Sequence, residues 1–403
     1  MSPVHSTCVR SRVSSLRRGR ADTVGAIVAR LPDEAFVVAM ARLPKVGPSR
    51  LRALLRRYEP EEAWSQVCRG SVDPVVVANP GRAGPGAIVA AWKRAAETLD
   101  PSAYWRAHIE AGVGVAVLGS ETFPAALAED DDPPAVLFWK GDIDHLAGTR
   151  VGIVGTRKAS RYGTDVANSM ARDLSEAGIA VVSGLALGID GAAHSGAVMA
   201  GGAPPIAVVG CGLDRVYPRE HRALWRRVAE VGVVISEYPL GAPAAAWQFP
   251  ARNRLIAALC DVLVVVESQY TGGALGTAVE AARRSRPVLA VPGPVTAPSS
   301  AGTNQLLFDG CSPARDATDV LLALGREPAA RRRASEHRVL PTGEAASVLE
   351  QLPWHAVSVE HVVVSTSLSL GTVALALEAL ETDGWITQRA GWVERLGRAS
   401  GPS

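Results

Sequence analysis

Residues 151–190 read VGIVGTRKASRYGTDVANSMARDLSEAGIAVVSGLALGID, and they contain a strand, a turn, a helix and a second strand without a gap. Residues 151–154 form a short apolar run that is typical of a strand buried on both faces. Apolar side chains at intervals of four predict a helix over residues 165–177, and the glycine that follows suits a left-handed helix end. The second strand ends at Ser183 and Gly184. This order predicts a βαβ unit with two parallel strands.

The turn after the first strand has the composition of a phosphate-binding loop. Gly155 lets the backbone turn sharply, so that the amides after it face open space at the carboxyl end of the strand. Thr156, Arg157 and Lys158 add a hydroxyl and two cations. For Arg157 we expect contact with an anion rather than a surface ion pair, whereas both roles stay open for Lys158.

Two common phosphate-binding motifs do not fit this turn. A dinucleotide fingerprint needs G-x-G-x-x-G and an acidic residue near the end of the second strand, whereas that strand ends here with Ser183 and Gly184. A Walker loop needs G-x-x-x-x-G-K-[ST], whereas TRKASRYG follows Gly155. These differences disfavour a nicotinamide enzyme and an NTPase, and we expect no cofactor.

The composition is typical of a large intracellular protein. A chain of 403 residues is too long for one ordinary core, so two or three domains are expected. Five cysteines, an odd number without a C-x-x-C pair, indicate reduced thiols in the cytoplasm and no metal site. We expect no contact with a membrane, because no apolar stretch approaches the length of a membrane span and residues 1–24 lack the apolar core of a signal peptide. With a net charge of only +2, any contact with nucleic acid must depend on local clusters of cations.

Composition and periodicity divide the chain into five parts. After residue 150, apolar runs alternate with helical patterns, which predicts an α/β fold with a Rossmann-like, doubly wound, mostly parallel sheet. Such sheets bind ligands beyond the carboxyl ends of their strands. The expected parts are a disordered basic arm (1–24), a helical region of the helix-hairpin-helix or SAM-like kind (25–116), a Rossmann-like domain (117–324, with a leading segment at 117–149), a linker (325–340) and a winged-helix domain (341–397).

Residues 43–58, LPKVGPSRLRALLRRY, place a Gly-Pro turn between two helical patterns. In a helix-hairpin-helix, such a turn can offer backbone amides to a phosphate. The interpretation that we prefer is a small helical bundle with a solvated basic face.

Residues 249–254, FPARNR, place a large aromatic side chain, two cations and an amide at the start of a predicted helix. Phe249 suits stacking on a base, while Arg252, Asn253 and Arg254 suit contacts with nearby phosphates. The alternative is a buried Phe249 that anchors the helix, with both arginines solvated. The residues by themselves leave both interpretations open.

Five further polar residues near the expected strand ends have two interpretations each. Ser160 and Tyr162 either cap and pack the following helix or contact a ligand. We expect His194, on a helix of small residues, to be packed or to cap rather than to act as a base. Glu237 and Glu267 are expected to orient facing cations rather than to catalyse a reaction.

Six segments along about 170 residues match one known family in the order that this family uses: VGIVGTRKASRYG, VVSGLALGIDGAAH, AVVGCGLDRVYPREH (207–221), ISEYPLG (235–241), FPARNRLIA (249–257) and NQLLFDG (304–310). The chain thus resembles the DNA-processing protein DprA (Smf) family. The resemblance implies a non-catalytic, Rossmann-like protein that binds single-stranded DNA and hands it to a recombinase of the RecA type during natural transformation. It also implies a homodimer, and contacts of Phe249, Arg252 and Asn253 with the DNA.

We expect the DNA strand to lie across the carboxyl ends of the sheet strands. The turn at residues 155–158 and the helix start at Gly272 and Gly273 would hold its phosphates. Ser183 and Gly184 would border the same path. A homodimer would offer two such sites to one strand and so add avidity.

Two positions depart from the family's pattern. The family usually reads SGLARGID, whereas Leu187 replaces the arginine here. Residues 271–281 read TGGALGTAVEA, which leans toward the GGxGTxxE motif of phosphoribohydrolases. The rival hypothesis is an enzyme of the nucleotide phosphoribohydrolase type, with Glu280 as its carboxylate and Arg157 holding a phosphate. The FPARNR segment and the flanking domains favour DNA binding.

The last part resembles the winged-helix domain that many members of this family append. Helical patterns are followed by short strand-like pieces near residues 386–388 and 392–395. The expected recognition helix, residues 370–381, contains two acids and no Lys or Arg. Because a helix in the major groove normally supplies cations for phosphates, we expect this one to bind a partner or to be structural.

Overall fold

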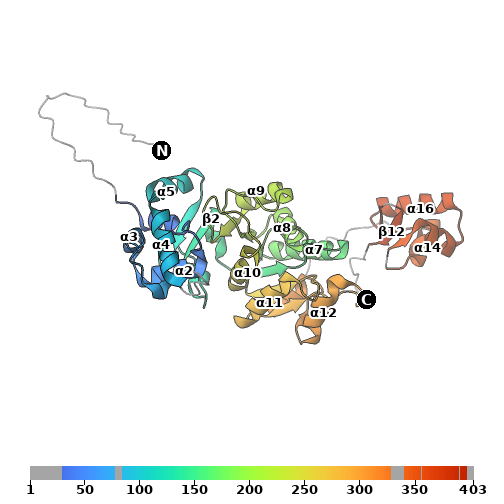
Figure 1. Ribbon diagram of the computed structural model, residues 1–403. Helices are drawn as coiled ribbons and strands as arrows, with labels where there is room; N and C mark the ends of the chain where they lie inside the picture. Colours follow the sequence, from blue (N-terminus) through green and yellow to red (C-terminus); the bar gives the residue numbers. More distant parts are fainter. Residues whose placement is uncertain (1–29, 78–83, 328–339, 355, 390, 397–403) are drawn as a thin grey trace, which may run out of the picture. The chain divides into compact units, whose positions relative to one another are not determined.

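The computed structural model describes residues 30–77, 84–327, 340–354, 356–389 and 391–396 (Figure 1). The chain divides into two compact units, Met1–Glu327 and Pro328–Ser403, and each is considered by itself. The expected arm at residues 1–24 lies outside the described residues, as does most of the expected linker at 325–340.

Helices build the N-terminal part of the first unit, and the predicted hairpin turn lies between the first two of them. Trp92 is completely buried, and its indole Nε1 donates a hydrogen bond to the Pro44 carbonyl in this turn at 2.9 Å. The helices are joined to the sheet, since Arg42 donates to the Leu240 carbonyl and the Leu240 amide donates to His108 Nε2 at 3.2 Å. They are α1 (Asp33–Met40), α2 (Gly47–Arg57), α3 (Pro60–Arg69), α4 (Gly84–Ala96) and α5 (Pro101–Glu110), with the short 3-10 helix η1 (Pro74–Val76).

A nine-stranded sheet of the described residues has the order β1-β2-β6-β5-β4-β3-β7-β8-β9. Strand β2 is antiparallel to both of its neighbours, and all other neighbouring pairs are parallel. The prediction of a mostly parallel sheet is confirmed. The strands are β1 (Gly114–Val117), β2 (Val136–Gly141), β3 (Arg150–Val154), β4 (Ala180–Ser183), β5 (Ile206–Val208), β6 (Val233–Ser236), β7 (Val262–Val265), β8 (Val288–Ala290) and β9 (Ser312–Pro313).

Helices cover both faces of this sheet, with α7 and α8 on one side and α10 and α11 on the other (Figure 1). Ile153 of β3 is buried against α7 and α8, whereas its neighbour Val154 is buried with residues of α10 and α11. A strand covered in this way needs apolar side chains at every position, which explains the continuous apolar run. The helices are α6 (Ala125–Ala128), α7 (Arg161–Glu176), α8 (Ile189–Ala200), α9 (Arg222–Val231), α10 (Gln248–Leu259), α11 (Gly273–Arg283), α12 (Ala301–Phe308) and α13 (Ala317–Ala323), with the 3-10 helices η3 (Ile143–Leu146), η4 (Arg219–His221) and η5 (Pro298–Ser300).

The strand order reverses at β3, which lies between β4 and β7. The chain passes from β3 to β4 on one side and returns after β6 to β7 on the other side. In open α/β sheets, a crevice forms at such a switch point, beyond the carboxyl ends of the strands. The turn after β3 and the loop after β7 flank this crevice.

The second unit has the helices and the small antiparallel sheet of a winged helix, as predicted. Its core packs Val373 and Leu377 of α16 against Trp385, while Leu375 of the same helix is exposed. Among the described residues, no single helix is long and apolar enough to cross a membrane, although the sharply bent pair α15 and α16 has the necessary length and composition. The elements are α14 (Gly343–Gln351), β10 (Val357–Ser358), α15 (Val359–Thr366), α16 (Leu370–Thr382), β11 (Ile386–Arg389) and β12 (Trp392–Arg395).

Candidate nucleic-acid interface

A cavity of about 490 Å³ lies at the switch point of the sheet. It is formed where the turn after β3, the loops after β4 and β7, and the start of α10 come together. Polar, glycine and aromatic positions dominate its lining, among them Gly155, Thr156, Arg157, Asp190, Tyr217, Phe249, Arg252, Asn253, Gln269, Gly272 and Gly273.

The turn between β3 and α7 is held by backbone hydrogen bonds from both sides. The Thr156 amide donates to the Glu267 carbonyl at 2.8 Å, and the Thr156 carbonyl accepts from the Ile189 amide at 3.3 Å. A Cβ at Gly155 would lie 2.8 Å from the Cβ of Ile189 and 2.9 Å from the Glu267 carbonyl oxygen. Only glycine fits there, and the turn is fixed between the ends of two neighbouring strands.

Glu267 holds the start of α7, and among the described residues no cation forms an ion pair with it, which corrects the expectation from sequence. Its carboxylate accepts hydrogen bonds from the Ser160 amide at 2.8 Å and from Ser160 Oγ at 2.6 Å. Ser160 Oγ in turn accepts from the Gly163 amide at 3.0 Å, so Ser160 caps the helix.

Tyr162 donates to the Pro292 carbonyl at 2.8 Å. His194 is completely buried, and burial lowers its pKa to about 3, so this histidine is packed and neutral.

Arg157 and Phe249 form the exposed centre of the cavity wall. The guanidinium carbon of Arg157 lies 4.9 Å from the centroid of the Phe249 ring. The centroids of the Phe249 and Tyr217 rings lie 5.2 Å apart. Among the described residues, no carboxylate lies within ion-pair distance of Arg157. Phe249 is half-buried and belongs to none of the apolar clusters of the described residues, so it is not a core anchor. An exposed cation thus lies over an accessible aromatic ring.

Arg252 lines the buried side of the cavity. It is not a free cation, although we expected it to contact a phosphate. The residue is only 4% exposed, and its Nη1 donates to the carbonyls of Gly184, at 2.9 Å, and of Val208. Its Nη2 lies 3.7 Å from the carboxylate of Asp190, and its Nε donates to Asn253 Oδ1 at 3.0 Å. These internal partners occupy the N–H groups of the guanidinium. Arg252 therefore supports the buried side of the cavity, which we call the cavity floor.

Three further residues do not lie where a DNA contact was expected: Arg254, Ser183 and Gly184. Arg254 points to the other side of α10, where it pairs with Glu237 at 2.5 Å and with Asp132 at 3.0 Å. Glu237 does orient a cation in this pair, as expected. Ser183 is buried and donates to the Ile153 carbonyl at 2.6 Å. A Cβ at Gly184 would lie 2.0 Å from Arg252 Nη2, so Gly184 makes room for that guanidinium instead of bordering an open path.

The start of α11 forms the opposite wall of the cavity. Gly272 precedes the helix and supplies no side-chain cap, so amides of the first turn have no intrahelical partner. Asn253 lines the cavity beside them and donates to the Gly273 carbonyl at 3.4 Å. Lys158 is exposed but does not line the cavity. Gly272, Gly273 and Asn253 are therefore brought together with Arg157, and Lys158 lies outside this group.

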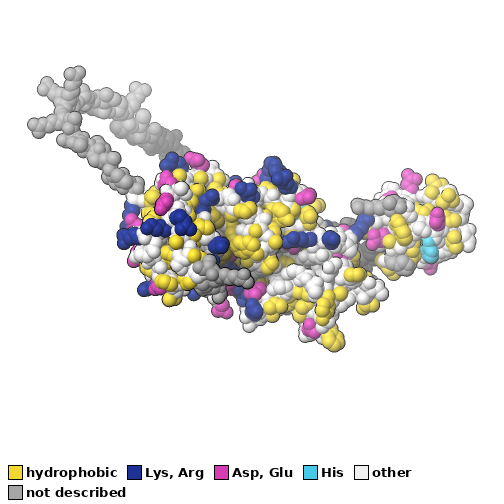
Figure 2. Space-filling view, in the orientation of Figure 1, with side chains coloured by type: hydrophobic (Ala, Val, Ile, Leu, Met, Phe, Trp, Pro, Cys, Tyr) yellow, Lys and Arg dark blue, Asp and Glu magenta, His cyan; other side chains and the backbone are white. Residues whose placement is uncertain are grey.

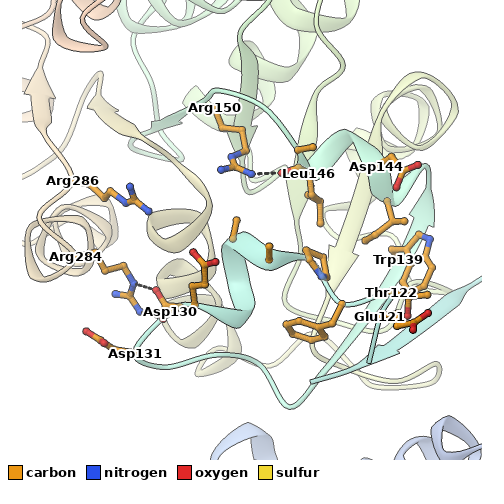
Figure 3. A pocket seen from close by; sticks show the side chains of 17 residues that line it. Glu121, Thr122, Asp130, Asp131, Trp139, Asp144, Leu146, Arg150, Arg284 and Arg286 are labelled. Carbon is orange, nitrogen blue, oxygen red and sulfur yellow. Dashed lines mark hydrogen bonds and ion pairs between the residues drawn. The ribbon is translucent and has the colours of Figure 1, made fainter. Parts of the chain in front are cut away.

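Glu280 lies away from the cavity, which disfavours the enzyme hypothesis. Its carboxylate is paired with Arg283 at 2.9 Å and with Arg284 at 2.7 Å. Figure 3 shows Arg284 bonded to Asp130 in a different cavity of about 840 Å³, near the amino end of β3. Arg157 thus lines the cavity at the switch point of the sheet, whereas Glu280 is not among the described residues that line it.

Sequence reasoning missed three of the polar and aromatic residues that line the cavity, namely Tyr217, Asp190 and Gln269. Tyr217 lies within the matching segment AVVGCGLDRVYPREH, so an aromatic residue shortly after a strand end was a usable signal. Asp190 lies at the start of α8, and only its distance to Arg252 reveals its role. Figure 2 shows Lys and Arg side chains over the N-terminal helices and over α9.

Comparisons with known proteins agree with the fold. The family described as "DNA recombination-mediator protein A" matches residues 114–325, which is more than half of the 403 residues. A second family, described as "DprA winged helix domain", matches residues 329–391.

Individual proteins extend this similarity. The "DNA processing protein DprA" of Bacillus subtilis is 37% identical over 215 residues, which cover 53% of this chain and 72% of that protein. "Protein Smf" of Synechocystis is 28% identical over 397 residues, which cover 89% of this chain and 98% of that protein. The crystal structure of DNA processing protein A from Streptococcus pneumoniae matches with a TM-score of 0.58 and 29% identity, over 72% of this chain and 96% of that chain.

Proposed function

Because the chain belongs to the DprA (Smf) family of DNA recombination-mediator proteins, we propose that it binds single-stranded DNA and catalyses no reaction on it. In this proposal the protein acts in the cytoplasm, where it protects single strands that enter the cell during natural transformation and loads a recombinase of the RecA type onto them. The names of the relatives refer to DNA processing, and the geometry of the cavity supplies the chemistry for binding.

The observation that carries the proposal is the pair formed by Arg157 and Phe249. A cation without an acidic partner attracts a phosphate, and an accessible aromatic ring beside it accepts a base by stacking. The two groups lie 4.9 Å apart, so one nucleotide can contact both. A binding site for single strands needs this combination, whereas a duplex keeps its bases away from such a ring.

The cavity also offers neutral donors to the phosphates. The first-turn amides of α11, at Gly273 and Ala274, lack intrahelical partners and are suited to an anion. Thr156 supplies a hydroxyl on the opposite wall, and Lys158 adds charge outside the cavity. We assign Arg252 a positioning role, because its bonds to Asp190 and Asn253 fix the start of α10, including Phe249.

The proposal also assigns roles to the second unit and to a second copy of the chain. Helix α16 carries no Lys or Arg and exposes Leu370 and Leu375, which suits a protein partner better than a phosphate backbone. A homodimer would present two cavities to one DNA strand and raise the overall affinity without new contacts.

One experiment tests the function directly. Binding of an oligothymidylate and of a duplex of the same length is measured over a range of salt concentrations, beside an assay for nucleotide hydrolysis. We expect preference for the single strand and no hydrolysis. Equal affinity for both DNA forms, or hydrolysis that is lost in a Glu280→Gln variant, would contradict the proposal.

We expect Arg157→Ala to weaken binding of the single strand and to reduce the slope of log affinity against log salt by about 0.7, because one phosphate contact releases about one counterion. The matched control is Arg172→Ala on the exposed face of α7, where the arginine pairs with Asp173. The control should bind as the wild type does. An unchanged slope in folded Arg157→Ala would remove Arg157 from the site.

Leu187→Arg should strengthen binding and steepen the salt slope by about 0.7, because it adds one cation beside the turn that holds Arg157. Leu187 is exposed, and the next residue, Gly188, lies against this turn: a Cβ there would be 2.3 Å from the Thr156 carbonyl oxygen. Leu187→Gln, which has a polar but uncharged side chain, serves as the control. If both variants bind equally, position 187 does not face the DNA.

A further inference from the structure

A second cavity, of about 800 Å³, shares a wall with the first. The shared wall is the segment 242–250, in which Phe249 lines the first cavity and Trp247 lines the second. The opposite wall of the second cavity is the hairpin turn between α1 and α2, with Lys45 and Gly47. The two cavities are therefore joined through one short piece of chain.

We infer that the second cavity binds a neighbouring nucleotide of the same DNA strand, with its phosphate at the start of α2 and its base against Trp247. This inference rests on the single-strand binding proposed above. It assigns the hairpin turn a direct contact with DNA, whereas the interpretation preferred from sequence was a helical bundle with a solvated basic face.

The start of α2 has the features of a phosphate site. The helix begins at Gly47 without a side-chain cap and with no acidic residue in its first turn, so the amides of Gly47 and Ser49 are available to an anion, whereas Pro48 has no N–H. Lys45 is exposed in the turn before it, and no ion pair of Lys45 exists among the described residues. The single acid among the described lining residues, Glu237, is neutralised by Arg254 at 2.5 Å. The cavity thus offers net positive charge to a phosphodiester.

The opposite side of the cavity has the features of a base site. Trp247 is 58% exposed, although it is a large aromatic residue, and its ring packs at 5.9 Å against that of Tyr238. Tyr238 lines the same cavity and is only 6% exposed, yet its hydroxyl has no hydrogen-bond partner among the described residues. Buried hydroxyls are normally satisfied, because an unmade bond costs free energy. A nucleotide in the cavity would offer polar atoms to this hydroxyl and a base to the indole.

The spacing of the two aromatic residues suits neighbouring nucleotides. Residues two positions apart have Cα atoms at most about 7.2 Å apart, so Trp247 and Phe249 are within reach of consecutive nucleotides. They face different cavities, which lets one strand pass over the shared wall and place one base on each side.

The test compares two oligothymidylates, one of about 5 nucleotides and one of about 15 nucleotides, which bracket the lengths that single-strand sites usually cover. Binding is measured for the full-length wild type, Trp247→Ala, Lys45→Gln and, as a matched exposed aromatic control, Phe308→Ala, in which the removed ring is 86% exposed on α12. We expect Trp247→Ala to lower affinity for both oligonucleotides by about 10-fold, the usual effect of one lost stacking contact, because consecutive nucleotides of either length reach both rings. The loss should be as large in a Phe249→Ala background, because the two rings hold different bases. Lys45→Gln should reduce the salt slope for both oligonucleotides by about 0.7.

The outcomes separate this inference from the proposed function. If Trp247→Ala and Lys45→Gln both bind the long oligonucleotide as the wild type does, the second cavity is not used, although single-strand binding stands. If Trp247→Ala costs no affinity in a Phe249→Ala background, Trp247 acts by supporting Phe249, and the inference is wrong. If the wild type binds neither length, the proposed function fails, and this inference fails with it.

Discussion

We expect Arg252→Ala to lower the free energy of unfolding by about 3–5 kcal/mol, the usual cost of breaking a buried ion pair from one side. The variant leaves the buried carboxylate of Asp190 without its cation, and the carbonyls of Gly184 and Val208 lose their donor. Urea denaturation of the variant and the wild type measures this loss. The matched control is Arg283→Ala, whose side chain is 70% exposed and paired at the surface, with an expected cost of about 0–1 kcal/mol.

The cost of Arg252→Ala should depend on pH. Burial raises the pKa of Asp190 above its ordinary value, and Arg252 opposes this rise. Without Arg252, the folded state binds the Asp190 proton more tightly than the unfolded state does, so stability falls as pH rises above the unfolded pKa of about 3.9. The destabilisation should be smaller at about pH 4 than at neutral pH. A cost that is independent of pH, or that persists unchanged in an Asp190→Asn background, would show that the pair does not support the cavity floor.

The fold and one wall of the site follow from local sequence. The run at residues 151–154 and the glycine after it predict a buried strand and a sharp turn, because both are decided within a few residues. The alternation of strands and helices then places the turn at the carboxyl ends of a parallel sheet. Gly155, Thr156 and Arg157 are brought to the cavity for this reason.

The roles of the two arginines on α10 do not follow from local sequence in the same way. Residues 252 and 254 are two positions apart on a helix, about 200° around its axis, so they cannot both face one DNA strand. Helical geometry thus contained the signal that Arg254 turns away, and sequence reasoning did not use it. The burial of Arg252 could not be predicted, because its partners Asp190 and Gly184 are more than 60 positions away in the chain. The contact of Glu267 with Ser160 at the start of α7 could not be predicted for the same reason, because the two residues are far apart in the chain.

We expect Phe249→Ala to weaken binding of single-stranded DNA by about 1–3 kcal/mol, or roughly 5-fold to 150-fold, because the variant removes an aromatic platform for one base. The salt slope should change little, since the ring holds no phosphate. Because Phe249 is half-buried outside the apolar clusters of the described residues, the melting temperature should stay close to that of the wild type.

Substitutions at the same position separate stacking from packing. Phe249→Trp keeps a stacking face and should retain most of the affinity, whereas Phe249→Leu keeps apolar bulk without an aromatic face and should bind nearly as weakly as Phe249→Ala. Arg157 lies over the Phe249 ring, so Arg157→Ala in a Phe249→Ala background should cost less affinity than it does alone if both contact one nucleotide. Fully additive losses would place the two groups on different nucleotides. A large drop in melting temperature with normal affinity of the folded fraction would instead make Phe249 a packing residue, and the stacking role would be wrong.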